Sequence, residues 1–275
     1  MRRHHSSKRS GPPPEMHPRA PSVMQREGQF TADSPLVAEV MPSANYDDRK
    51  PDIIVLHSIG SATAGEALRT LCTPDLPRVS AHYWISEEGR IVQLVPETMR
   101  AWHAGPSTWA GANDINSRSI GIELSVLNKI INNADFPDRQ IDAVIELCLD
   151  IANRYFIRPE RVLAHSDIAP ARKRDPGEKF PWGELHARGV GHWVEPAPIT
   201  DEPSLGPGDL GPAVTSLQSD LKRYGYGVRP TGTYDPPTEQ VVQAFQRHFR
   251  PTRVDGIADR STCITLQRLL AGLDS

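Results

Sequence analysis

The sequence predicts an α/β protein in which helices flank a mixed central sheet, followed by a C-terminal three-helix bundle. Short β-branched runs alternate with stretches of helical periodicity up to residue 194, a pattern typical of α/β domains. Residues 205–275 carry helical periodicity alone, in three stretches joined by Gly-rich and Pro-rich turns. Residues 195–204 are Pro-rich and lack periodicity, so we interpret them as a linker between two domains.

Four elements are expected in the first part of the α/β domain. Residues 53–56 form a β-branched apolar run that predicts a buried strand, with His57 at its end. Residues 64–72 predict a short helix that a proline ends, and residues 81–85 and 91–95 predict a hairpin around a glycine. Because α/β proteins place ligands at strand ends, His57 is a candidate functional residue.

Two more strands and a long helix complete this domain. Within residues 119–124, isoleucine and leucine alternate with glycine and Glu123, which predicts a strand. Its apolar face belongs in the core, so Glu123 points either to solvent or into a cleft. Residues 138–155 have apolar side chains at helical spacing and predict an amphipathic core helix. Residues 162–164 predict a further strand that ends at His165 and leads into a loop.

The ends of the chain differ in character. Residues 1–33 contain a Gly-Pro-Pro-Pro run and almost no β-branched or aromatic residues, so they predict a disordered tail. The α/β domain then spans residues 34–194. A chain of 275 residues fits one or two domains, which agrees with this division.

Charge and cysteine content exclude several classes of protein. Lysine and arginine number 31 against 34 acidic residues, a formal charge of -3 that offers no field for holding nucleic acid. No apolar run is long enough for a membrane span, and no secretion signal is recognisable at the N-terminus. Three cysteines without a CxxC pair argue against a disulfide framework. These observations predict a cytoplasmic protein.

Two histidines and an aspartate form a candidate metal site. His57 and His165 each end an apolar run, and Asp175 follows within one loop of His165. Two neutral imidazoles and one carboxylate are a common zinc set, with a fourth position open to water. Taken alone, the same residues also fit two structural histidines and a solvated surface aspartate.

The sequence resembles a known family throughout residues 50–183. The segments that carry the resemblance are Ile54–His57, Val79–Tyr83, Ala101–Gly105, Asn116 with Ser119–Leu124, and Ala164–Pro170 with Lys173 and Asp175. Their order and spacing are similar to those of the zinc-dependent N-acetylmuramoyl-L-alanine amidases, in particular the AmpD/AmiD-like group. The resemblance implies the fold of the phage amidases and the peptidoglycan recognition proteins.

The resemblance also implies roles for individual residues. It makes His57, His165 and Asp175 the zinc ligands, with Asp where some relatives use Cys. It makes Glu123 the catalytic carboxylate, which takes a proton from water and passes it to the leaving amine. Lys173 matches the cation that stabilises the oxyanion. No redox cofactor is implied.

Several further residues are candidates for contacts with substrate. The two histidines of this group could line the implied substrate groove, the asparagine could hold a substrate, and the tryptophans could stack on sugar or cover the peptide. The group consists of His82, Trp102, His103, Trp109, Asn116 and Trp182. Aromatic residues lie more often in a core than on a ligand, and Asn116 could equally hold a loop. Both alternatives are open from the sequence.

The C-terminal residues 205–273 resemble the three-helix peptidoglycan-binding module found on wall hydrolases. Such a module implies that a weak wall contact keeps the enzyme near an insoluble substrate, which also raises the periplasm as an alternative location. The implied activity is cleavage of the amide between N-acetylmuramic acid and L-alanine, in peptidoglycan or in muropeptides, by a monomer. The alternatives are an inactive peptidoglycan-binding protein and a zinc peptidase that acts on other amides.

Overall fold

The computed structural model describes residues 31–273 apart from residues 44, 49–50, 62, 75–77, 128–134, 201 and 203. Most of the predicted N-terminal tail, residues 1–30, lies outside the described residues. Asp33, at the end of that predicted tail, is bonded to the sheet. Its backbone N–H donates to Gln93 Oε1 at 2.9 Å, and its carboxylate accepts from the backbone N–H of Glu97 at 2.8 Å.

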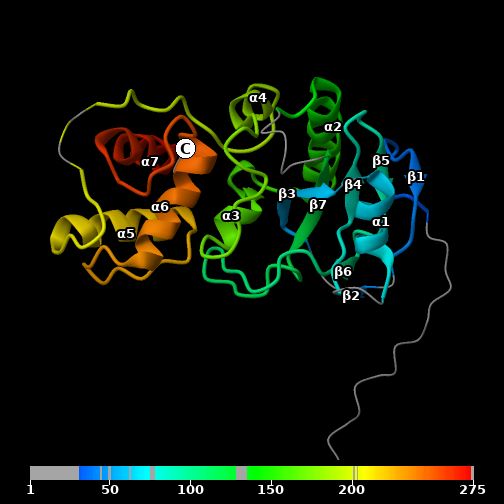
Figure 1. The fold of residues 1–275 in the computed structure, drawn as a ribbon, viewed down its shortest axis with the longest axis horizontal. Coiled ribbons are helices and arrows are strands. Elements are labelled where there is room, and N and C mark those ends of the chain that lie inside the picture. The colour runs from blue at the N-terminus through cyan, green and yellow to red at the C-terminus, as the bar shows by residue number, and fades with distance from the viewer. Residues whose placement is uncertain are drawn as a thin grey trace, which may run out of the picture.

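A mixed sheet forms the centre of the α/β domain, as the sequence predicts (Figure 1). Within the described residues it has six strands in the order β1-β5-β4-β7-β3-β8. Neighbouring strands are parallel except β4 and β5, which form the expected antiparallel hairpin. The strands are β1 (Glu39–Val40), β3 (Ile53–Ser61), β4 (Tyr83–Ile85), β5 (Ile91–Gln93), β7 (Ser119–Leu127) and β8 (Val162–Ala164). A separate antiparallel pair joins β2 (Tyr46–Asp48) to β6 (Met99–Ala101).

Helix α2 (Asp138–Tyr155) covers one face of this sheet. Ile122 of β7 and Leu56 of β3 lie in the same apolar cluster as Val144 of α2, and all three are fully buried. Because side chains alternate across a strand, the neighbours His57 and Glu123 belong to the opposite face. Helix α1 (Ala64–Cys72) packs its buried residues into another cluster formed mainly with β4, β5 and the chain that follows β5.

The sequence predicts α1 and α2 with the bounds observed, but several strand ends differ. Strand β4 begins at Tyr83, β5 ends at Gln93 and β7 continues to Leu127. Strand β3 continues past His57 to Ser61, because β7 pairs with it residue by residue from Ile53↔Ser119 to Ser61↔Leu127. His57 therefore lies within a strand. Strand β8 ends at Ala164, and His165 begins the four-residue helix α3 (His165–Ile168) inside the expected loop. A further short helix, α4 (Trp182–Ala187), follows.

The C-terminal bundle consists of α5 (Pro212–Tyr224), α6 (Pro236–Phe249) and α7 (Arg260–Leu273). A buried glutamine ties the turn before α7 to α6. Gln246 donates to the carbonyl of Ile257 at 2.8 Å and accepts from the backbone N–H of Gly256 at 2.9 Å. The first part of the predicted linker lies against α7, where Ala197 donates its N–H to Thr265 Oγ1 at 3.1 Å.

The bundle is docked on the α/β domain, with α3 lying between α6 and the sheet (Figure 1). One apolar cluster contains residues of both units, Ile53, Val55 and Leu163 from the sheet among them. Trp109 is 2% exposed and lies edge-on to Tyr226, with ring centroids 4.9 Å apart. The shared cluster favours a fixed arrangement of the two units.

A buried carboxylate joins α3 to the bundle. Asp167 is fully buried and accepts hydrogen bonds from the Tyr226 hydroxyl and from His248 Nδ1, each at 2.7 Å. It also accepts from the backbone N–H of Ala164, at the start of α3, at 2.8 Å. The helix that begins with His165 is thereby bonded to two bundle residues.

Candidate active site

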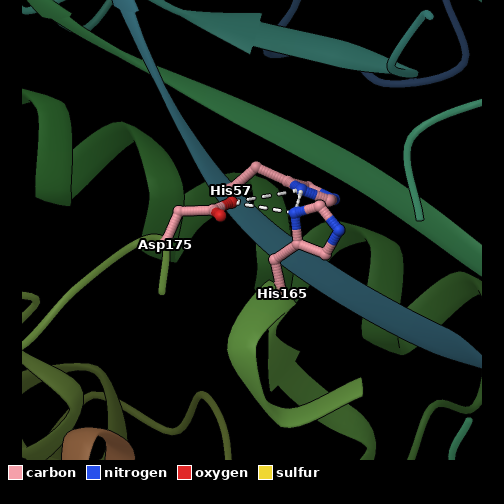
Figure 2. A group of neighbouring side chains, drawn as sticks. All are labelled: His57, His165 and Asp175. Atoms are coloured by element: carbon pink, nitrogen blue, oxygen red, sulfur yellow. Dashed lines mark hydrogen bonds and ion pairs between the residues drawn. The ribbon is translucent and has the colours of Figure 1, made fainter. Parts of the chain in front are cut away.

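Three side chains from separate elements meet on the face of the sheet opposite α2 (Figure 2). His57 comes from β3, His165 from the first position of α3, and Asp175 from the loop that follows α3. The two Nδ1 atoms are 2.9 Å apart, and Asp175 Oδ2 lies 2.9 Å from His165 Nδ1 and 3.5 Å from His57 Nδ1. Tetrahedral zinc bonds of about 2.1 Å place ligand atoms about 3.4 Å apart, so this triangle fits a metal ion.

The protonation of the cluster also fits a metal. Burial, helped by the neighbouring His165, lowers the pKa of His57 to about 4, so this imidazole is neutral at pH 7. Burial alone would raise the pKa of Asp175, but the two adjacent imidazoles of His165 and His57 hold this pKa well below its usual range. A neutral imidazole and an ionised carboxylate are the forms in which these side chains bind metals.

Glu123 and Lys173 line one pocket together with two residues of the cluster. The pocket has a volume of about 210 Å³ and its lining includes His165 and Asp175. Glu123 on β7 is the register partner of His57 on β3, so strand pairing sets its position. The other lining residues are Ser58, Ile59, Leu71, Val79, Ser80 and His103. The five residues that the family resemblance singles out are therefore brought together.

The candidate substrate residues lie in different places. His103 lines the pocket, and Trp102 is half-buried outside its lining. His82 is fully buried, where it accepts from the N–H of Gly121 at 2.9 Å and donates to the Met99 carbonyl at 3.0 Å. Asn116 Oδ1 accepts from the backbone N–H groups of His103 and Ala104, at 3.0 and 2.8 Å. These two hydrogen bonds hold the loop, which is one of the two roles that the sequence left open for Asn116. A substrate role for these residues stays a prediction.

The two remaining tryptophans lie between the domains. Trp109 packs against the bundle, and Trp182 is 4% exposed and stacks on His248 at a centroid distance of 3.7 Å. Neighbouring side chains cover both rings, which is the core position that the sequence left open for them. Arg172 was not predicted from the sequence. Its guanidinium donates to the Pro106 carbonyl at 2.9 Å and to the Ala104 carbonyl. Only its adjacency to Lys173 could have pointed to it.

Comparison with known proteins identifies the family. The sequence matches the N-acetylmuramoyl-L-alanine amidase family over residues 47–178 and a peptidoglycan binding domain family over residues 211–270. It is 42% identical over 235 residues to the N-acetylmuramoyl-L-alanine amidase AmiD of Escherichia coli, covering 79% of this chain and 82% of that protein. The chain belongs to the N-acetylmuramoyl-L-alanine amidase family.

Two solved structures resemble nearly the whole amidase chain. One is E. coli AmiD in complex with the substrate anhydro-N-acetylmuramic acid-L-Ala-D-gamma-Glu-L-Lys, at a TM-score of 0.67 and 36% identity, covering 90% of this chain and 93% of that one. The other is AmpDh3 of Pseudomonas aeruginosa in complex with an anhydromuramic pentapeptide, at a TM-score of 0.65 and 27% identity, covering 92% and 99%. Both support the fold and activity predicted from the sequence.

The predictions of amidase activity and of an α/β domain with a C-terminal helical bundle are therefore confirmed. Throughout the described residues, every helix is too short or too polar to cross a lipid bilayer. The three cysteines are free thiols, as expected, and burial raises the pKa of Cys148 to about 12. The compartment and the monomeric state stay predictions.

Proposed function

We propose that the amidase holds one zinc ion between His57 Nδ1, His165 Nδ1 and Asp175 Oδ2, and that it cleaves muropeptides between N-acetylmuramic acid and L-alanine. The observation that carries this proposal is the convergence of three metal-ligand atoms, two of which belong to residues that line one pocket with Glu123 and Lys173. Zinc bound by such residues polarises a carbonyl and makes water more acidic.

The protein side chains account for proton transfer and charge stabilisation. Water adds to the carbonyl carbon, and Glu123 accepts the proton that this water loses. When the carbon–nitrogen bond breaks, Glu123 returns the proton to the amine of the departing L-alanine. Lys173 places a positive charge beside the oxyanion that forms during the addition. Both side chains line the pocket without belonging to the ligand triangle.

We further propose that 1,6-anhydro-muropeptides are among its substrates. This follows from the bound molecules named for AmiD and AmpDh3, two relatives that align with almost the entire chain. The test uses purified protein with defined muropeptides, with and without the anhydro ring, and with intact sacculi. Mass spectrometry should find a free N-terminal L-alanine peptide and an intact sugar. Products cut elsewhere in the peptide would instead identify a peptidase.

The bundle supports a second part of the proposal, namely contact with peptidoglycan. Residues 211–270 match a peptidoglycan binding domain family, and the bundle is packed on the domain that carries the pocket. We propose that it holds glycan or peptide near the cleft. Co-sedimentation of the full chain with purified sacculi tests this role, and a protein that stays in the supernatant would refute it.

Metal analysis gives the first prediction. We expect about one zinc ion per chain, loss of activity on chelation, and recovery when zinc is restored. Asp175→Ala should lose the ion, because one of the three ligands is removed from the triangle. Asp142→Ala is the matched control, since Asp142 is exposed on α2 and pairs with Arg188. An active protein without a transition metal that tolerates chelators would contradict the proposed site.

A further inference from the structure

We propose that the dipeptide His103–Ala104 positions both histidine ligands by fixing the tautomer of each. His57 Nε2 lies 2.9 Å from His103 Nδ1, and His165 Nε2 lies 3.2 Å from the carbonyl oxygen of Ala104. Two consecutive residues thus contact the far nitrogen of both imidazoles. The inference rests on the proposed metal site, because a fixed tautomer matters where the opposite nitrogen binds an ion.

The direction of each hydrogen bond follows from groups that have only one role. The Ser119 hydroxyl donates to the Ile115 carbonyl at 2.6 Å, so its oxygen is left to accept from His103 Nε2 at 3.2 Å. In a neutral His103 the lone pair is then on Nδ1, which accepts from the Nε2–H of His57. The lone pair of His57 therefore stands on Nδ1, the atom that faces the cluster.

The second histidine is fixed more directly. A carbonyl oxygen can only accept, so His165 must donate its Nε2–H to Ala104. Its lone pair is then also on Nδ1, 2.9 Å from Asp175 Oδ2. Both imidazoles thus present lone pairs to one point, and this result depends on the backbone and side chain of one dipeptide.

The surroundings of the dipeptide hold it in place. Asn116 Oδ1 accepts from both of its backbone N–H groups, and Asn116 is 7% exposed. Gly121 of β7 lies against the His103 ring so closely that a Cβ there would stand 2.4 Å from Cγ. The ring of His82 packs edge-on at a centroid distance of 5.6 Å. His103 is therefore a positioning residue whose ring is confined on several sides.

The main experiment measures zinc affinity by competition with a chelating dye. His103→Phe keeps a flat ring but cannot accept from His57, so we expect zinc to bind about 10- to 100-fold more weakly, the usual effect of losing such a partner. His103→Gln offers an acceptor oxygen and should recover part of the affinity. His192→Phe is the control, because His192 bonds to Tyr224 Oη, away from the cluster.

Two further measurements separate positioning from folding. The visible absorption of the cobalt-substituted protein should change in His103→Phe, and the unfolding temperature of the metal-free variant should stay near that of the control. Ser119→Ala is a milder variant. It removes the hydroxyl that accepts from His103, at the end of the series of hydrogen bonds that begins at His57, and should weaken zinc binding by a smaller factor. If His103→Phe fails to fold, Ser119→Ala decides the question.

The outcomes are distinguishable. Wild-type protein that takes up no metal would overturn the proposed metal site and this inference with it. Wild-type protein that binds zinc, together with folded His103→Phe and Ser119→Ala variants of unchanged affinity and unchanged cobalt spectrum, would overturn the role of the dipeptide alone. Weaker zinc binding with partial recovery in His103→Gln supports it.

Discussion

Replacing Glu123 by glutamine is expected to lower kcat by about a hundredfold or more while zinc content stays at the wild-type level. Glutamine has nearly the same shape but cannot carry a proton from water to the leaving amine. Glu123 is fixed opposite His57 by strand pairing and lies outside the ligand triangle, so the substitution should leave the metal in place. Hydrolysis of a defined muropeptide and metal analysis of the same sample measure both effects.

Glu146→Gln is the matched control, because Glu146 is exposed on α2. It should keep wild-type kcat and metal content. Near wild-type turnover in Glu123→Gln would reduce Glu123 to a structural residue of β7. Loss of zinc in the same variant would show that it supports the metal site instead of moving a proton.

Replacing Trp109 by alanine is expected to lower the free energy of unfolding by about 3–5 kcal/mol, the usual cost of removing a buried large aromatic side chain. The ring fills the junction between the α/β domain and the bundle. It lies edge-on to Tyr226 and so close to Gly225 that a Cβ there would stand 2.5 Å from the indole. Alanine would leave a cavity at the junction that the surrounding side chains cannot close without moving.

Chemical denaturation of the full chain measures this loss. Phe156→Ala provides the control, since Phe156 is 90% exposed at the end of α2 and should change stability by less than about 0.5 kcal/mol. A Trp109→Ala protein as stable as this control would mean that docking of the bundle adds little to the fold. A separate unfolding step for the bundle would lead to the same conclusion.

Local patterns predicted the regular elements well. Helices α1 and α2 have the bounds read from their apolar spacing, because each buries one face. The predicted end of β3 was wrong, because the residues after His57 are extended through their pairing with β7. Helix α3 was missed because four residues are too few to show a period.

For the active site, motif resemblance predicted which residues converge but not how they are supported. His57, His165 and Asp175 lie together, and Glu123 and Lys173 line one pocket with His165 and Asp175. The contact of His165 with Ala104 uses a backbone carbonyl, which leaves no trace in residue type.

The docking of the bundle could not be predicted either. Trp109 is separated from Tyr226 by more than a hundred positions, and Asp167 meets His248 across 81. Contacts over such separations impose no local periodicity, so the sequence predicts a linker and a bundle but not how the two domains pack.

The hydrogen bonds between Asp167 and the bundle affect which bonds of a bound substrate the cleft can reach. When a binding module is joined to its enzyme by a flexible linker, the enzyme can cleave any bond within the length of that linker. Here the short helix that begins with His165 is bonded to Tyr226 and His248, so the bundle and the cleft stand at one separation. A glycan strand held by the bundle would therefore reach the cleft at a constant distance from the point where the bundle binds it. Cleavage along such a strand should then show a spacing set by the protein.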